Sequence, residues 1–198
     1  MFLRVLAEGP GSAWRAEAAM LKRRGEGAFS RRNPFWRYGA LQLAMLALVW
    51  GLGGWVGLAL FVYQAFIAVW QLELVNYVEH YGLTREYLGE GRYEPVRPRH
   101  SWNAAYKASN WLLINLQRHS DHHGKPDRRF PLLQNYAADE APQLPHGYPV
   151  MTAAAMVPWV WRRMMNRRVK AWRKQFYPGI TDWTPYAKGL NPAPKGAP

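Results

Sequence analysis

Apolar residues are concentrated in one long block of the chain. Within residues 36–78 the only charged residues are Arg37 and Glu73. One crossing of a hydrocarbon layer of ~30 Å takes about 20 residues, so the block is too long for one crossing and long enough for two short ones. A glycine-rich break at residues 51–54 lies near its middle. The pattern predicts a two-helix transmembrane hairpin over residues 35–81.

The two helices of this hairpin are expected at residues 35–50 and 55–81. The alternative is a buried helix pair of a soluble protein, but such a pair would carry charges on its solvent side. Basic residues flank the block on both sides, and the glycine turn has none. By the positive-inside tendency, both ends lie in the cytoplasm. The flanking residues are Lys22, Arg23, Arg24, Arg31, Arg32 and Arg37 before the block, and Arg85, Arg92, Arg97 and Arg99 after it.

The rest of the chain is predicted to be helical or loop, so the expected fold class is all-α. Residues 1–34 form a basic cytosolic N-terminal segment, and residues 82–176 form a cytosolic or interfacial helical region. Residues 177–198 are rich in proline and glycine and are expected to be a frayed tail. No strand is predicted. Helices are expected over residues 12–24 with Ser12 as the N-cap, over 101–123, and over 152–176 with an irregularity at Pro158.

Charge and cysteine content narrow the function classes. The 198-residue chain has a formal net charge of +13 and no cysteine, which excludes disulfides, iron–sulfur clusters and cysteine-based zinc sites. A second basic run is interleaved with tryptophan and methionine, as in a helix that lies on an anionic membrane or docks on the protein. Because the membrane flanks account for the charge, no nucleic-acid partner is expected. The run comprises Arg162, Arg163, Arg167, Arg168, Lys170, Arg173 and Lys174.

Three imidazoles within five residues mark the candidate chemistry. On a helix, His119, His122 and His123 fall within an arc of about 100°, whereas Asp121 points to the other side. Imidazole is the commonest protein ligand for transition metals. Gly124 follows at once, so the cluster is expected on the last turn of its helix. The alternative is a histidine-rich surface tract, but the spacing at the end of an apolar run favours a metal site.

A fourth imidazole lies at the cytosolic end of the second predicted membrane helix. His80 shares a helix face with Glu73 and Asn76, which precede it by seven and four residues. Ionisable groups in membrane helices usually face a pathway or a site. His80 is therefore a candidate ligand, and Glu73, Asn76 and Glu79 are candidates to hold imidazole N–H groups. The alternative is that this end emerges into headgroups, where polar residues cost little.

Two segments resemble signature segments of the membrane-bound alkane monooxygenases. They read Asn-Tyr-Val-Glu-His-Tyr-Gly-Leu at residues 76–83 and Leu-Gln-Arg-His-Ser-Asp-His-His at residues 116–123. Shorter stretches at residues 12–17, 98–103 and 142–148 also resemble this family. The resemblance runs in order over about residues 10–170.

The resemblance implies a non-haem diiron enzyme of the bacterial inner membrane, multi-pass, with its histidine boxes on the cytoplasmic side. Such enzymes insert one oxygen atom of O₂ into the terminal carbon of an alkane with electrons from rubredoxin. It implies that the iron ligands here are His80, His119, His122 and His123. Imidazole suits iron(II) and leaves positions open for O₂.

The chain departs from this family because two earlier histidine boxes are absent. No histidine precedes His80, and only His100 and His146 remain besides the four predicted ligands. His100 and Asp121 are candidates to support the ligands, and His146 is expected to be solvated. We therefore expect a C-terminal portion that is inactive alone and needs a second chain for the missing boxes. The alternatives are a fatty-acyl desaturase or hydroxylase of the same type and a non-catalytic remnant.

Overall fold

A computed structural model describes residues 2–90 and 92–186 of the chain. The fold is mostly helical, as predicted. The chain divides into two units, Met1–Glu73 and Leu74–Pro198, and each unit is described by itself. Most of the tail predicted at residues 177–198 lies outside the described residues.

The first unit contains α1 and most of α2. Helix α1 runs over Phe2–Arg23 and continues through Pro10, so it begins earlier than predicted. The prediction of Ser12 as an N-cap is wrong, because Ser12 lies inside the helix and its hydroxyl donates to the Gly9 carbonyl at 2.8 Å. Helix α2 runs over Pro34–His80.

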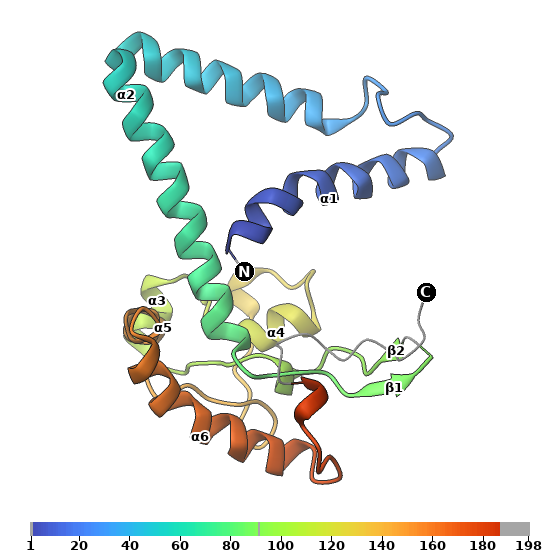
Figure 1. Cartoon of the computed structure of the whole chain (residues 1–198), viewed down its shortest axis with the longest axis vertical. Helices are drawn as coiled ribbons and strands as arrows, with labels where there is room; N and C mark the ends of the chain where they lie inside the picture. The colour runs from blue at the N-terminus through green and yellow to red at the C-terminus, as the bar shows by residue number, and fades with distance from the viewer. Residues whose placement is uncertain (1, 91, 187–198) are drawn as a thin grey trace. The chain divides into compact units, whose positions relative to one another are not determined.

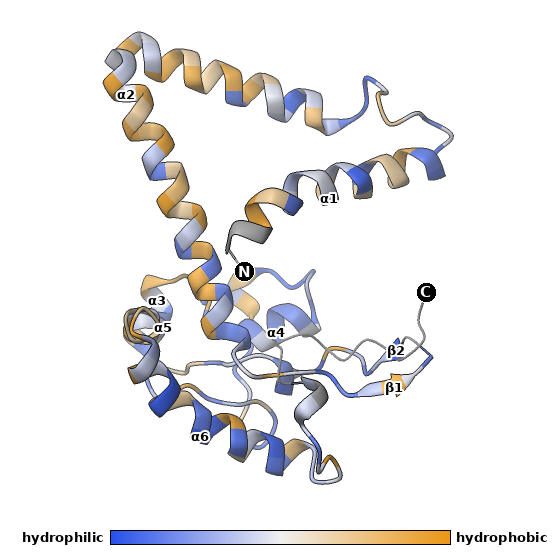
Figure 2. Cartoon of the chain, in the orientation of Figure 1, coloured by the Kyte–Doolittle hydropathy of each residue, from blue (hydrophilic) through white to orange (hydrophobic). Residues whose placement is uncertain are grey.

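Helix α2 contains the long apolar block and bends sharply at one residue (Figures 1 and 2). Gly54 has φ 56° and ψ −150°, a conformation that is essentially restricted to glycine. The break between the two helical segments is therefore confined to this residue rather than spread over four. By length and composition α2 is apolar enough to cross a membrane, and the hydropathy of its most apolar window averages 2.0.

The second unit contains the remaining elements, mostly short. The two strands were not predicted; they pair antiparallel through Tyr87 and Tyr93 in the segment expected to be loop. The elements are β1 (Tyr87–Gly89), β2 (Arg92–Tyr93), η1 (Pro98–His100), α3 (Lys107–Leu112), α4 (His119–Gly124), η2 (Phe130–Leu132), α5 (Tyr148–Ala155), α6 (Pro158–Phe176) and η3 (Thr184–Tyr186).

The single helix predicted over residues 101–123 is wrong. Helix α3 ends at Leu112, and six residues separate it from α4. Ile114 and Asn115 have φ of 52° and 64°, in the left-handed region that ends a right-handed helix. Asparagine tolerates this region, but for a β-branched isoleucine it is strained by about 1–3 kcal/mol. The histidines therefore lie along a separate short helix, not on the last turn of a long one.

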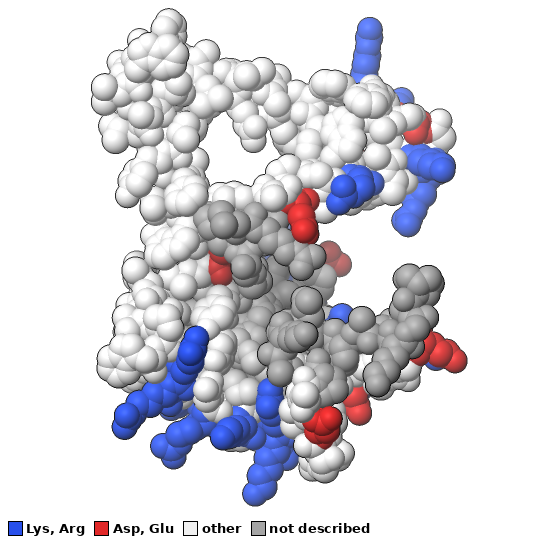
Figure 3. Space-filling model, in the orientation of Figure 1, with Lys and Arg blue, Asp and Glu red and all other residues white. Residues whose placement is uncertain are grey.

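The core of the second unit is built on one face of α6. Trp161, Met165, Val169 and Trp172 recur at helical spacing and are buried. They pack against the end of α2 and the loops around it, so α6 docks on the protein through its apolar face. Lys and Arg side chains gather over α6 on the opposite side (Figure 3). Other members of this core are Val78, Trp102, Ala104, Leu144, Tyr148 and Met151.

The start of the tail is packed rather than frayed, contrary to prediction. The ring of Trp183 lies 6.2 Å from that of Trp172 and 6.0 Å from that of Tyr177, centroid to centroid. The Arg173 guanidinium lies 4.4 Å from the Trp183 ring centroid. These contacts extend the α6 core to at least residue 183.

Gly82 follows α2 and packs against Val169 of α6, where there is no room for a side chain. Its φ is +70°, and an added Cβ would lie 2.6 Å from Val169 Cγ2. We expect Gly82→Ala to lower the free energy of unfolding by about 2 kcal/mol or more, from backbone strain and overpacking together. Gly25→Ala is the matched control, because Gly25 has φ +78° with nothing within 4 Å of the added Cβ. Thermal unfolding of both variants in detergent measures the difference in their loss of stability. Equal losses would contradict a contribution from overpacking against Val169.

Candidate metal centre

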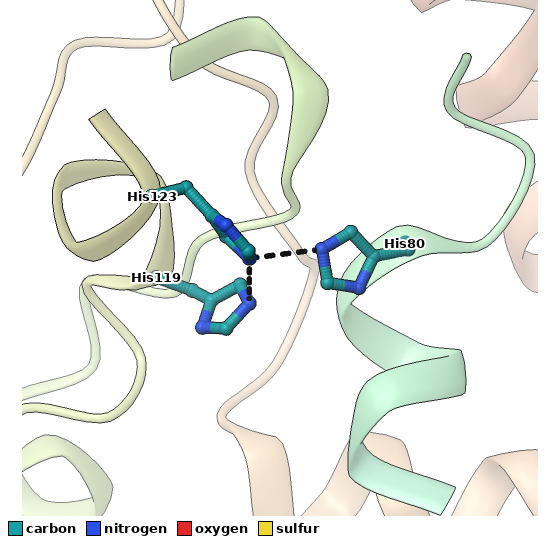
Figure 4. A group of neighbouring side chains, drawn as sticks. All are labelled: His80, His119 and His123. Atoms are coloured by element: carbon teal, nitrogen blue, oxygen red, sulfur yellow. Dashed lines mark hydrogen bonds between the residues drawn. The ribbon is translucent and has the colours of Figure 1, made fainter. Parts of the chain in front are cut away.

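Three imidazoles from two helices converge on one point (Figure 4). The Nε2 atom of His123 lies 3.2 Å from His80 Nε2 and 2.8 Å from His119 Nε2. Candidate ligand atoms of all three residues lie within 4.8 Å of one another. His80 and His123 are 43 residues apart in sequence. The structure therefore brings together three of the four predicted ligands.

The orientation of the His80 ring is fixed by the backbone of its own helix. Its Nδ1–H donates to the carbonyl of Asn76 at 3.0 Å, one turn earlier on α2. Since a carbonyl only accepts, this bond places the proton on Nδ1 and leaves Nε2 free to bind a metal. Asn76 thus holds the imidazole as predicted, but through its main-chain oxygen.

Asp121 anchors helix α4 through its side chain, which is fully buried. Its carboxylate accepts hydrogen bonds from Arg128 at 2.7 Å, from the Gln134 backbone N–H at 2.8 Å and from the Tyr136 hydroxyl at 2.8 Å. Burial alone would raise the pKa of Asp121, but these three donors lower it below its usual value. Asp121 therefore ties α4, which carries the candidate ligands His119 and His123, to the loop that follows it.

The first turn of α4 is held by Asn103 and Ser120, which the sequence analysis did not single out. The Asn103 side chain donates to Ser120 Oγ at 2.5 Å and accepts from the Ser120 backbone N–H at 3.1 Å. Both residues are fully buried. This pair takes the place of a side-chain cap, which α4 lacks at Arg118. In the sequence, the only signal at Asn103 is that residues 98–103 resemble a segment of the alkane monooxygenase family.

Glu79 reaches the imidazole cluster from α2. Its Oε2 atom lies 3.3 Å from His119 Nε2, and the residue is buried. Its Oε1 atom has no hydrogen-bond partner among the described residues. Burial and the nearby Glu79 carboxylate raise the pKa of Tyr148 well above its usual value. The structure thus places Glu79 beside an imidazole of the cluster, but at the Nε2 atom that converges with His123 and not at the Nδ1 atom, which has no partner among the described residues.

The remaining predicted residues lie at or beyond the edge of the cluster. His122 is exposed, with its ring centroid 6.0 Å from that of His119 and 5.8 Å from that of His123. Glu73 lies two helical turns before His80, and its buried Oε2 has no partner among the described residues. His146 is exposed, as predicted, and its ring stacks on that of Tyr106.

His100 does not support an imidazole of the cluster, contrary to prediction. The Arg97 backbone N–H donates to its Nδ1 at 2.9 Å, so Nε2 carries the proton and donates to Glu94 Oε1 at 3.1 Å. The Tyr177 hydroxyl also donates to Glu94. His100 therefore belongs to a buried network that ties α6 to the segment before η1. It reaches the cluster only across a pocket of ≈ 180 Å³ that it lines with His80 and His123.

Burial and neighbouring rings disfavour the charged form of His119 and of His123. Burial, followed by the neighbouring His123, His80 and His122 rings, lowers the pKa of His119 to about 3. Burial and two neighbouring imidazoles also lower the pKa of His123. Neutral imidazole is the form that binds a metal. Three converging, neutral nitrogen donors beside a buried carboxylate fit a divalent transition metal such as iron(II).

A mostly helical chain that gathers imidazoles at the end of a long apolar helix fits the class of histidine-box metal proteins. A family model described as Fatty acid desaturase matches residues 2–155, and the chain belongs to this family.

Three curated relatives show where the similarity lies. Alkane 1-monooxygenase 2 of Alcanivorax borkumensis is 44% identical over 174 residues, which cover 86% of this chain and 43% of the relative. Alkane 1-monooxygenase 1 of Pseudomonas aeruginosa is 44% identical over 81% of this chain and 42% of its own length. The xylene/toluene monooxygenase hydroxylase component XylM of Pseudomonas putida is 28% identical over 83% of the chain and 42% of its own length. The chain thus spans less than half the length of these relatives.

Proposed function

We propose that this chain is the C-terminal part of a membrane monooxygenase that hydroxylates the terminal carbon of alkanes at a non-haem diiron centre, and that it supplies some of the histidine ligands. The observation that supports it best is the convergence of three Nε2 atoms from helices that are far apart in sequence. The 44% identity to alkane 1-monooxygenases over most of the chain supports the same substrate class.

In this proposal each residue of the cluster has a distinct task. Iron, when bound by His80, His119 and His123, supplies the redox chemistry that activates O₂. The Asn76 carbonyl orients His80. The Glu79 carboxylate faces the Nε2 atom of His119 that converges with the other imidazoles, so it is an oxygen donor beside them rather than the partner of a ring N–H. His122 lies on the exposed side of the cluster, where it is available to a second metal ion shared with donors from elsewhere.

The chain is incomplete as a diiron site in this proposal, because a pair of irons takes more donors than these four imidazoles provide. A second polypeptide with further histidines completes it. In this proposal the protein lies in the bacterial inner membrane as a multi-pass hairpin with both ends in the cytoplasm, and the length and apolar composition of α2 support this location. A rubredoxin-type protein delivers the electrons on that side.

Reconstitution tests this function directly. We expect the chain purified alone to hold well below two irons and to convert no hexadecane to 1-hexadecanol. Co-expression with the preceding half of the Alcanivorax borkumensis relative is expected to raise the iron content and produce the alcohol when rubredoxin and its reductase are supplied. The same pair carrying His119→Ala is the control. Two irons and alkane-dependent O₂ uptake by the chain alone would contradict the proposed incompleteness.

A second candidate is a fatty-acyl desaturase or hydroxylase, which the family match favours. The same reconstituted pair distinguishes the two functions. Oxidation of an acyl chain with no oxidation of hexadecane would replace alkane hydroxylation by this activity. No oxidation of either substrate, with both chains folded, would favour a non-catalytic remnant.

A further inference from the structure

The second unit exposes a band of large apolar side chains beside the histidine helix. We call it the α3 patch. Within it Leu112 is 73% exposed and Trp111 is 69% exposed. Single exposed apolar residues are normal, but a contiguous patch of this kind marks an interaction site. The α3 patch consists of Trp111, Leu112, Ile114, Leu116, Phe130 and Leu132.

Hydrogen bonds hold the two parts of the α3 patch together. The Asn115 side-chain amide donates to the Phe130 carbonyl at 3.0 Å, and the Arg118 guanidinium donates to the Leu133 carbonyl. Helix η2 is therefore fixed against the connection between α3 and α4. Leu113, which lies between two exposed residues of the patch, turns inward and packs on the core. The patch is thus a fixed surface of the folded unit.

A pocket of ≈ 380 Å³ opens at the edge of the α3 patch. Lys107 and Arg118 line it together with Asn110, Asn135 and Trp111. The Lys107 ammonium lies 4.8 Å from the Trp111 ring centroid. Two cations and two amides in one hollow favour an acidic or hydrogen-bonding side chain, which hydrocarbon cannot provide.

We propose that the α3 patch is the docking surface for the polypeptide that supplies the remaining metal ligands, with an acidic side chain of that polypeptide in the pocket. This inference rests on the proposed function. The first part of the α3 patch ends at Leu116, three residues before His119, and its second part at Phe130 and Leu132 follows α4, so a chain docked there lies next to the connections at both ends of the histidine helix. More than half the length of the curated relatives lies outside the matched region and is available to cover this surface.

Because the chain has no cysteine, one introduced cysteine reports on this surface. A nitroxide spin label is attached at Leu112→Cys in the full chain in nanodiscs, with Leu88→Cys on β1 as the control. Leu88 is similarly exposed, at 59%, and lies outside the α3 patch. Electron paramagnetic resonance then compares the chain alone with the chain co-expressed with the preceding half of the Alcanivorax borkumensis relative.

We expect the label at residue 112 to become immobile and inaccessible to oxygen only when the second half is present, whereas the label at residue 88 stays unchanged. Shielding of residue 112 in the chain alone would overturn the proposal, because the chain would cover its own patch. High oxygen accessibility in the presence of the second half would also overturn it, because the patch would then face lipid.

Copurification without added metal provides a second readout that is independent of iron and of activity. We expect Leu112→Lys with Ile114→Lys to reduce recovery of the second half at least tenfold, and Lys107→Glu to reduce it by a smaller factor. Leu88→Lys should leave recovery unchanged. Wild-type recovery by the double variant, or no association of the wild-type chain, would refute the docking surface. If association is retained but no oxidation follows, the proposed function fails and the docking surface stands.

Discussion

Replacing His119 or His123 by alanine is expected to weaken metal binding at least about 100-fold. Mutating a residue that hydrogen-bonds to a metal ligand typically lowers the metal affinity 10–100-fold, and we expect loss of a direct ligand to exceed that range. Both imidazoles contribute an Nε2 atom to the same point, and the separation of these two atoms is 2.8 Å. Titration with Co²⁺ in nanodiscs, followed by visible absorption, measures the affinity.

His122→Ala is the matched comparison on the same helix. Because its ring lies outside the group of three, we expect less than a tenfold loss in the chain alone. His146→Ala, on a turn that stacks on Tyr106, should have no effect. Equal losses for His119 and His122 would show that α4 rearranges when metal binds and would contradict the three-histidine cluster.

Asp121→Asn is expected to destabilise the second unit by about 3 kcal/mol at pH 7. The fully buried carboxylate accepts from Arg128, from the Gln134 N–H and from Tyr136, and an amide cannot satisfy all three donors. Removing one member of a buried ion pair costs about 3–5 kcal/mol, and the partial exposure of Arg128 places this case at the lower end. Denaturant unfolding followed by near-UV circular dichroism measures the loss.

The same variant has a defined pH dependence. The pKa of Asp121 is lowered in the folded protein, so the unfolded chain takes up the proton first as the pH falls. The stabilisation is therefore complete above the unfolded pKa of about 3.9 and is lost as the pH falls through the folded value. The difference between wild type and Asp121→Asn should shrink in that window. The exposed Asp127→Asn is the control, and a difference that persists at low pH would contradict this account.

Local patterns were sufficient for the long elements of this protein. The apolar block, with only two charged residues, predicted α2, and the glycine-rich break predicted its bend at Gly54, because apolar composition and glycine's wide φ range are local properties. The periodic tryptophans and methionines predicted a helix where α6 lies, but the single helix expected over residues 152–176 is wrong, because α5 ends at Ala155 and α6 begins at Pro158. The spacing of the histidines, together with the family resemblance, singled out the candidate ligands before any contact was known.

Contacts that periodicity does not report decided the rest. Strands β1 and β2 pair Tyr87 with Tyr93, and Trp183 packs on Trp172, so these features depend on strand pairing and ring contacts rather than on a sequence repeat. The Asn103–Ser120 pair that starts α4 joins residues 17 positions apart.

The sequence by itself determined which residues are candidates to bind a metal, because donor type and helical spacing are local properties of the chain. Only the tertiary structure decided that His80 joins His119 and His123 while the ring of His122 lies outside. It also showed that Asp121 accepts a hydrogen bond from Arg128 and that His100 donates to Glu94. The physical reason is that the orientation of an imidazole ring depends on its hydrogen-bond partners and on the side chains packed against it. The fold brings these partners next to the ring.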